Sequence, residues 1–220
     1  MISLAVSLFI TGTDTGVGKT YLTLQLLRLL RARGLRCAGF KPICCGDRRD
    51  AELLLAASSE GLTIDEINPL WLRTPLAPFA ASLIEHVEID TNRLLDAFEK
   101  LTTRCDCVLV EGVGGWLVPI TQNYFVSDLA GAMKLPVLVV AQNRLGCLNH
   151  TLLTLRNIEA AGARCSGVVL HSAQATDDIA AATNSDMLRR LIDAPMLPTV
   201  TEQLTELPLE WLRALDSNRE

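Results

Sequence analysis

Gly18, Lys19 and Thr20 close a glycine-rich segment, TGTDTGVGKT, that follows an apolar run from Leu4 to Ile10. Glycines allow backbone N–H groups to approach an anion closely, and a helix that begins after such a loop favours negative charge at its N-terminus. The pattern is typical of a phosphate-binding loop. In such a loop Lys19 reaches the β- and γ-phosphates, and the Thr20 hydroxyl binds Mg²⁺.

The loop is one residue longer than the common G-x4-G-K-[ST] pattern. Five residues separate Gly12 from Gly18, and Thr13 stands where the first glycine is usual. The apolar strand before the loop and the helical pattern from Tyr21 onward are the context that such a motif requires. The sequence therefore predicts a nucleotide site formed by Gly12, Thr13, Asp14, Thr15, Gly16, Val17, Gly18, Lys19 and Thr20.

Lys41 and Asp50 lie where a second strand and its following helix are expected. Lys41 stands between the apolar run 37–40 and Pro42, which places it at the carboxyl end of the predicted strand. Ligands of open α/β sheets bind at those ends, so we expect a functional role for Lys41. Asp50 suits the first turn of the next helix and is also suited to ligate Mg²⁺, and both interpretations stay open.

An acidic residue and a glycine loop follow the apolar run Cys107 to Val110. We expect a buried strand that ends at Val110, with Glu111 directed toward Mg²⁺ from its carboxyl end. The backbone N–H groups of the loop are expected to face an anion or a substrate. The loop consists of Gly112, Val113, Gly114 and Gly115.

Apolar runs alternate with amphipathic segments along the rest of the chain. Strands are predicted at 135–141, 165–170 and 194–200, and helices at 79–86, 91–101, 127–134, 147–161, 177–191 and 207–215. Residues 61–80, which contain three prolines, are expected to be irregular. The alternation predicts a mainly parallel, doubly wound α/β sheet with helices on both faces, and residues 1–220 are expected to form one domain.

Composition excludes several function classes. The net charge of −5 provides no electrostatic footprint for nucleic acid, and no segment approaches the roughly 20 apolar residues of a membrane span. The N-terminal apolar run lacks a basic segment before it, so we expect no signal peptide and a cytoplasmic protein. The odd count of seven cysteines argues against a disulfide framework, and their spacing argues against a metal–thiolate site.

Four segments together resemble the dethiobiotin synthetase family, the penultimate enzymes of biotin synthesis. They are TGTDTGVGKT at 11–20, GFKP at 39–42, VEGVGGW at 110–116 and GCLNH at 146–150. The longer phosphate loop is that family's own form. The resemblance covers about residues 7 to 171 and implies a fold of the P-loop NTPase type.

The resemblance also implies a reaction. The family converts 7,8-diaminopelargonic acid, CO₂ and ATP to dethiobiotin, ADP and phosphate. A substrate amine first becomes a carbamate, which attacks the γ-phosphoryl group to form a carbamic–phosphoric anhydride. The second amine then closes the ureido ring and expels phosphate. Such phosphoryl transfer depends on alignment and charge neutralisation.

Roles for individual residues follow from the same resemblance. Catalytic roles fall to Lys19, Lys41 and Thr15, and Mg²⁺ ligation to Thr20, Asp50 and Glu111. The substrate residues are Lys41, Cys45, Pro78, Gly112, Val113, Gly114, Gly115, Gly146, Cys147, Leu148 and Asn149. The family is homodimeric, and the turn 146–149 of the neighbouring chain receives the substrate carboxylate at a helix N-terminus.

Three positions depart from the family pattern. Cys45 stands where Ser or Thr is usual, and Phe79 follows Pro78 where His is common. His171 replaces the Asn that reads the adenine edge. Because neutral His offers its one donor and one acceptor in a different geometry, we expect either relaxed base preference or a harmless replacement.

Competing interpretations fit less well. Partition and septum-placement ATPases carry an extra lysine near the start of the loop, where this chain has Thr13 and Asp14. Cobyrinic acid amidating enzymes have a separate glutaminase domain, for which 220 residues leave no room. A non-catalytic or diverged nucleotide-binding protein would need no second lysine and no further carboxylates, unlike a chain with Lys41, Asp50 and Glu111.

Overall fold

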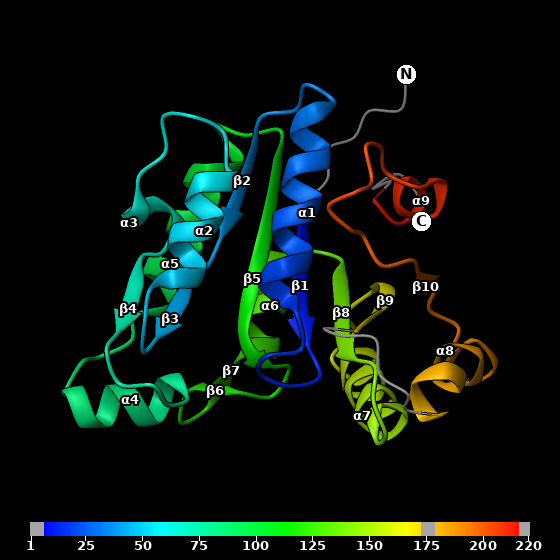
Figure 1. Ribbon diagram of the computed structural model, residues 1–220. Helices are drawn as coiled ribbons and strands as arrows, with labels where there is room; N and C mark the ends of the chain where they lie inside the picture. Colours follow the sequence, from blue (N-terminus) through cyan, green and yellow to red (C-terminus); the bar gives the residue numbers. More distant parts are fainter. Residues whose placement is uncertain (1–6, 173–178, 216–220) are drawn as a thin grey trace.

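A computed structural model of the chain describes residues 7–172 and 179–215. Its centre is a six-stranded sheet in the order β10-β9-β8-β1-β5-β2 (Figure 1). Every pairing between neighbouring strands of this sheet is parallel. The strands are β1 (Leu8–Gly12), β2 (Cys37–Phe40), β5 (Cys107–Gly115), β8 (Val137–Gln142), β9 (Cys165–His171) and β10 (Met196–Leu197). The predicted parallel α/β sheet is confirmed.

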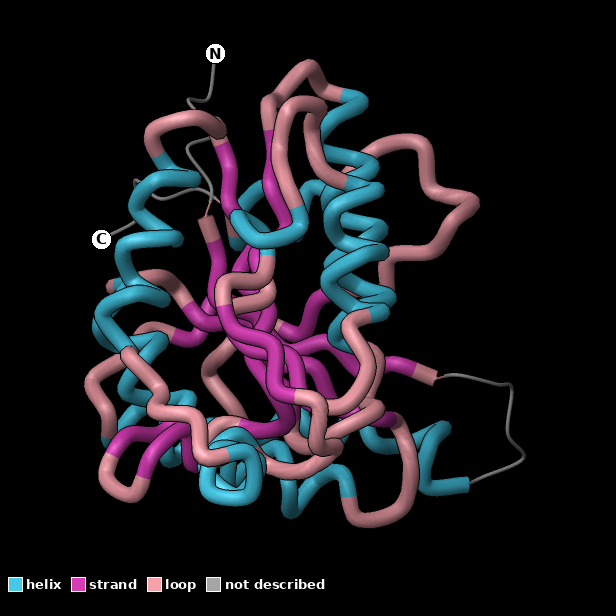
Figure 2. Tube along the Cα trace, turned by 90° about the vertical axis from the view of Figure 1, so that its left-hand side faces the viewer, coloured by secondary structure: helices cyan, strands magenta, loops and turns pink. Residues whose placement is uncertain are grey.

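Helices cover both faces of the sheet, as the view turned by 90° shows (Figure 2). In Figure 1, α1 (Lys19–Ala32) and α2 (Arg49–Ala57) lie in front of the strands, and α5 (Thr91–Thr102) and α6 (Val126–Met133) lie behind them. Next to β8 and β9 are α7 (Cys147–Ala160) and α8 (Ile179–Leu191). No helix within the described ranges is long and apolar enough to cross a membrane.

Short elements surround the carboxyl ends of the strands. They are β3 (Ile43–Cys45), β4 (Leu70–Leu72), β6 (Pro119–Thr121), β7 (Tyr124–Phe125), α3 (Ile64–Ile67) and α4 (Pro78–Glu85). The expectation that residues 61–80 are irregular was therefore wrong. Thr63 and Glu66 form a capping box that starts α3, and β4 pairs with β3.

Several predicted boundaries also need correction. Strand β5 continues to Gly115 instead of ending at Val110, because its pairing with β1 includes Ile10 with Glu111 and Gly12 with Gly115. Glu111 therefore lies inside the strand. Strand β10 is shorter than predicted, and the final helix is α9 (Leu209–Ala214). The predicted starts of the first strand, at 4–6, and of the helix at 177 lie outside the described residues.

Gly39 allows the helix layer to pack tightly on β2. A Cβ at this position would lie 2.9 Å from Leu27 Cδ1 and 3.0 Å from Leu54 Cβ, so α1 and α2 would have to move. We predict that Gly39→Ala lowers the free energy of unfolding by about 1–3 kcal/mol, measured by urea denaturation. Gly131→Ala is the matched control.

Gly131 lies exposed in α6, where a Cβ would meet nothing within 4 Å. The same change there should stabilise the protein by roughly 0.5–1 kcal/mol. Equal effects of the two substitutions would contradict the packing argument.

Candidate nucleotide and substrate site

The loop between β1 and α1 needs glycine at two positions for steric reasons. A Cβ on Gly12 would lie 2.7 Å from Val17 Cγ2 and 2.9 Å from Lys19 Nζ. Gly18 has φ +100°, and a Cβ there would lie 2.4 Å from the His171 ring. Inside this loop Lys19 Nζ donates to the Asp14 carbonyl at 2.8 Å, so the ammonium lies over the loop backbone.

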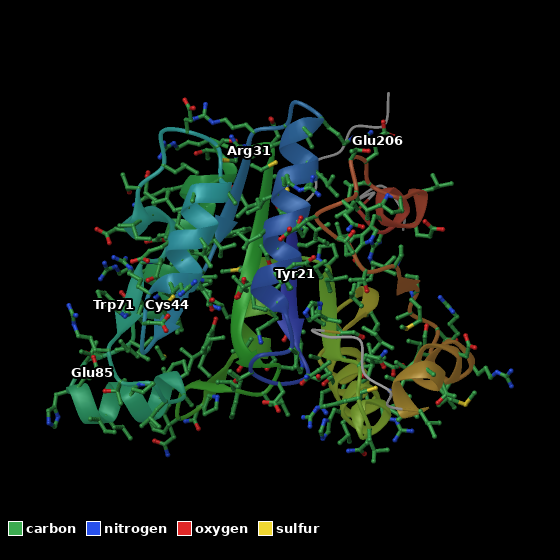
Figure 3. The ribbon with its side chains drawn as sticks, in the orientation of Figure 1. Tyr21, Arg31, Cys44, Trp71, Glu85 and Glu206 are labelled. Carbon is green, nitrogen blue, oxygen red and sulfur yellow. The ribbon has the colours of Figure 1, made fainter. Side chains whose placement is uncertain are left out.

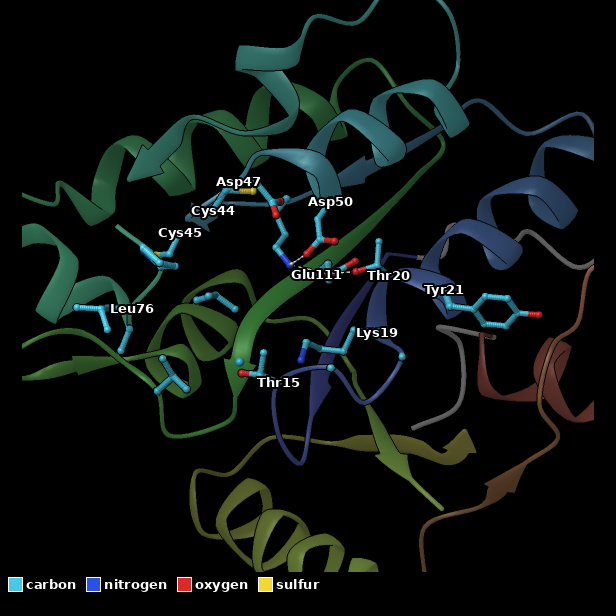
Figure 4. A pocket seen from close by; sticks show the side chains of 18 residues that line it. Thr15, Lys19, Thr20, Tyr21, Cys44, Cys45, Asp47, Asp50, Leu76 and Glu111 are labelled. Atoms are coloured by element: carbon cyan, nitrogen blue, oxygen red, sulfur yellow. Dashed lines mark hydrogen bonds and ion pairs between the residues drawn. The ribbon is translucent and has the colours of Figure 1, made fainter. Parts of the chain in front are cut away.

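A buried cluster of charged groups lies beside the loop (Figure 4). Lys41 Nζ is 2.6 Å from Glu111 Oε1 and 3.0 Å from Asp50 Oδ2. Thr20 Oγ1 donates to the same Glu111 oxygen at 2.8 Å. The Glu111 side chain is fully buried and that of Lys41 is 5% exposed, whereas Asp50 is 45% exposed. The structure thus brings together the predicted residues Thr20, Lys41, Asp50 and Glu111.

Asn68 and Arg48 fix the position of Lys41, and neither was predicted from the sequence. The buried Asn68 amide donates to the Lys41 carbonyl at 2.8 Å, and the Lys41 N–H donates to the Ile67 carbonyl at 2.8 Å. Arg48 Nε donates in turn to Asn68 Oδ1 at 2.9 Å. Neither residue belongs to a periodic pattern, so only its contacts indicate its role.

Burial and neighbouring charges shift the pKa values of both lysines. Burial and the nearby Lys41 ammonium lower the pKa of Lys19 to about 8. Burial also disfavours the charged form of Lys41, but the Glu111 and Asp50 carboxylates outweigh it and raise the pKa of Lys41. Burial acts to raise the pKa of Asp50, yet the Lys41 ammonium holds it below its usual value. Lys41 and Asp50 therefore form a charged pair at neutral pH.

A cavity of about 640 Å³ opens next to this cluster. The predicted residues that line it are Thr15, Gly16, Gly18, Lys19, Thr20, Lys41, Cys45, Asp50, Glu111, Val113 and Gly114. The lining also includes residues that were not predicted, namely Tyr21, Cys44, Asp47, Pro75, Leu76, Ala77 and Val118. Residues 75–77 form one edge of the cavity, which we call the rim. In the sequence, only the prolines of the 61–80 segment indicated a role for these residues.

Two cysteines form part of this lining. Cys44 lies on β3 directly beside Trp71 on β4, and Trp71 Nε1 donates to the Gly46 carbonyl at 2.8 Å (Figure 3). Burial raises the pKa of the Cys44 thiol to about 11 and that of Cys45 to about 12. Both side chains are therefore neutral thiols near pH 7, and Cys45 offers a weak donor where the family resemblance leads us to expect a hydroxyl.

The other predicted site residues do not line this cavity. Thr13, Asp14 and Gly115 line, together with Thr15, a second hollow of about 290 Å³ that faces α7. Pro78 is buried at the start of α4, next to Ala77 on the rim. The remaining residues outside the lining are Gly12, Val17, Gly112, His171, Gly146, Cys147, Leu148 and Asn149.

His171 lies at the carboxyl end of β9, close to the phosphate loop. Its ring centroid is 5.1 Å from that of Tyr21, and the two planes are tilted by 36°. Partial burial lowers the pKa of His171, which favours the neutral ring. The residue that the resemblance assigns to the adenine edge, His171, therefore lies beside Gly18 and packs against Tyr21.

Comparisons with known proteins identify the family of this chain. An AAA domain family model matches residues 6–204. The ATP-dependent dethiobiotin synthetase BioD of Akkermansia muciniphila is 46% identical over 188 residues, which are 86% of this chain and 88% of that protein. The protein of the same name from Aromatoleum aromaticum is 42% identical over 200 residues, with 87% and 88% covered. The chain belongs to the dethiobiotin synthetase family.

Solved structures share the fold of this dethiobiotin synthetase family member at low identity. A ParA family ATPase from Chlorobium tepidum is 12% identical with a TM-score of 0.54, covering 89% of this chain and 83% of that one. The septum site-determining protein MinD of Pyrococcus horikoshii, solved in complex with Mg-ADP, is 14% identical with a TM-score of 0.53, covering 88% and 81%. These likenesses support the P-loop NTPase fold alone.

The lowered pKa of Lys19 predicts a pH dependence of ADP binding. Bound phosphate groups should raise the pKa of Lys19. ADP binding therefore takes up a proton only at a pH at which Lys19 of the ligand-free protein is deprotonated. Affinity should therefore be constant just below pH 8 and fall by up to about tenfold per pH unit above it. Isothermal titration calorimetry between pH 7 and 9.5 measures this. Lys19→Gln should bind weakly at every pH, and an equal slope in that variant would assign the titration to another group.

Proposed function

We propose that the protein converts 7,8-diaminopelargonic acid, CO₂ and ATP to dethiobiotin, ADP and phosphate. The proposal is carried by one observation: two lysines, a threonine and two carboxylates line the same cavity. They are Lys19, Lys41, Thr20, Asp50 and Glu111. Two lysines can neutralise charge on a reacting phosphoryl group and a carbamate. The family assignment supports this choice of substrates.

The chemistry of the oxygen donors fits Mg²⁺. The Thr20 hydroxyl, Asp50 and Glu111 supply hard oxygen ligands of the kind that Mg²⁺ prefers. Glu111 Oε2 is buried and has no hydrogen-bond partner among the described residues, so it has capacity for a further ligand. We propose that these three side chains hold the ion, which when bound neutralises charge on the ATP phosphates.

The chain's own groups have distinct tasks in the proposed reaction. The loop amides and Lys19 bind the phosphates of ATP, and Lys41 orients the carbamate toward the γ-phosphorus. The carbamate oxygen attacks that phosphorus and ADP leaves. The second amine then attacks the carbamate carbon, and phosphate leaves as the ring closes. The apolar side chains of Leu76, Ala77 and Val118 line the same cavity and suit the aliphatic chain of the substrate.

We further propose a homodimer in which the turn 146–149 of one chain serves the neighbouring active site. That turn does not line the cavity of its own chain. Large apolar side chains near it are exposed, with Leu145 at 80%, Leu153 at 52% and Leu117 at 55%. Their burial between two copies would stabilise a dimer. Sedimentation velocity should show a dimer for the wild type and a shift toward monomer for Leu153→Glu.

Phosphate release from Mg-ATP and bicarbonate tests the proposed activity. It should depend on added 7,8-diaminopelargonic acid, and mass spectrometry should detect dethiobiotin. Nucleotide binding without diamine dependence would favour the alternative, a diverged protein that acts on another amine or carboxylate.

Lys41→Ala should separate nucleotide binding from turnover. Because ADP lacks the γ-phosphate that Lys41 is proposed to face, ADP affinity measured without Mg²⁺ should change little. Its loss should lower kcat by roughly 100-fold or more, as is typical when transition-state charge stabilisation is removed. Steady-state phosphate release measures kcat, and calorimetry measures ADP binding. A kcat near that of the wild type would show that Lys41 lies outside the reaction.

His171→Asn tests the base preference. If the His171 ring relaxes recognition of the base, the wild type should discriminate less between ATP and CTP or GTP than the variant does. The ratios of kcat/KM for these nucleotides measure the preference. Comparable ratios in both proteins would mean that the replacement is harmless.

A further inference from the structure

The Lys41 ammonium lies among the oxygen atoms that are expected to bind the metal. It contacts Glu111 Oε1 at 2.6 Å and Asp50 Oδ2 at 3.0 Å, and Thr20 Oγ1 shares the same Glu111 oxygen at 2.8 Å. One lysine thus contacts both carboxylates of the set. In Figure 4 Asp50 and Glu111 converge on one point from α2 and β5, with dashed lines ending there.

Binding of a second cation among these oxygens is disfavoured while the ammonium is present. Mg²⁺ requires oxygen ligands at about 2.0–2.1 Å, and it would lie within a few ångströms of the ammonium charge. Repulsion between like charges is strong at such a distance in a buried site. The fully buried Glu111 cannot be left without a cation either, because an uncompensated buried carboxylate is strongly unfavourable.

Lys19 cannot replace Lys41 in this role. Its ammonium donates to the Asp14 carbonyl and makes no ion pair within 4.0 Å among the described residues. The exposure of Asp50, at 45%, leaves one side of the Lys41 cluster open to the cavity. An incoming phosphate group therefore has access to the Lys41 ammonium from that side.

The geometry points to Lys41 as an internal cation that occupies the metal site until a nucleotide phosphate draws its ammonium away. The inference rests on the proposed function, since it takes Thr20, Asp50 and Glu111 as the metal ligands. Metal and nucleotide then bind cooperatively, and each increases the affinity for the other by the same factor. Without nucleotide the protein binds divalent cations weakly.

Mn²⁺ binding in the absence of nucleotide tests this role. Electron paramagnetic resonance should show weak binding to the wild type and binding tighter by roughly tenfold or more to Lys41→Met, which keeps an apolar stem but removes the charge. Lys41→Arg, which retains a cation, should bind as weakly as the wild type. In the double variant with Glu111→Gln the gain should disappear. Equal affinity in the wild type and Lys41→Met, or a gain that survives Glu111→Gln, would overturn the inference.

A measurement on the wild type covers the case in which Lys41→Met fails to fold. The chain has four lysines, so the side-chain NMR signal of Lys41 can be assigned after selective labelling. Mg²⁺ alone should leave this signal unchanged, and Mg-ATP should shift it. A shift with Mg²⁺ alone would overturn the inference. Neither experiment uses the diamine. Absence of dethiobiotin formation would therefore contradict the proposed function but not the inference about Lys41.

Discussion

The contact between Lys41 and Glu111 is the interaction on which the site depends. Glu111 lies fully buried in β5, and a buried carboxylate is strongly unfavourable without a cation and a hydrogen-bond donor beside it. Lys41 supplies the cation from the end of β2, and Thr20 supplies the donor from the first turn of α1. The order β1-β5-β2 and the parallel direction of these strands bring the three groups to one edge of the sheet. A change in strand order would leave a buried charge unpaired.

The same contact determines what the cavity can do. Before any ligand binds, the positive charges of two lysines are matched by the negative charges of two carboxylates. These residues are Lys19, Lys41, Asp50 and Glu111. ATP brings several negative charges and Mg²⁺ brings two positive ones, so the two together change this balance less than ATP alone. In the cavity, these charged residues lie next to apolar residues such as Leu76 and Val118. This combination suits an aliphatic substrate whose polar end reacts with a phosphoryl group.

The sequence was sufficient to predict the main sheet because its strands are uninterrupted apolar runs. All five residues of β1 and all four of β2 are buried, and such runs are typical of parallel strands. Strand β5 was predicted too short because Glu111 and the glycines after it resemble a loop. Only pairing with β1, about 100 residues away, keeps that segment extended. Strands β3 and β4 are three residues each, which is too short for a periodic signal.

Phosphate-loop residues could be predicted because neighbouring residues in the sequence make the loop. For Lys41 and Glu111, the sequence could predict only that both lie at the same edge of the sheet. Their direct contact could not be predicted, since Glu111 lies 70 residues further along. The support from Asn68 and Arg48 and the rim at 75–77 depend on tertiary contacts in a segment with no pattern. The position of His171 against Gly18 and Tyr21 likewise depends on how β9 ends beside α1.

A crystal structure with Mg²⁺, a non-hydrolysable ATP analogue and 7,8-diaminopelargonic acid would show whether the metal replaces the Lys41 ammonium at the Asp50 and Glu111 carboxylates. We expect the metal on Thr20, Asp50 and Glu111, with the Lys41 ammonium moved from the carboxylates to the γ-phosphate and the substrate. A metal bound elsewhere, or a Lys41 ammonium that stays between Asp50 and Glu111 beside the bound nucleotide, would contradict this exchange of cations.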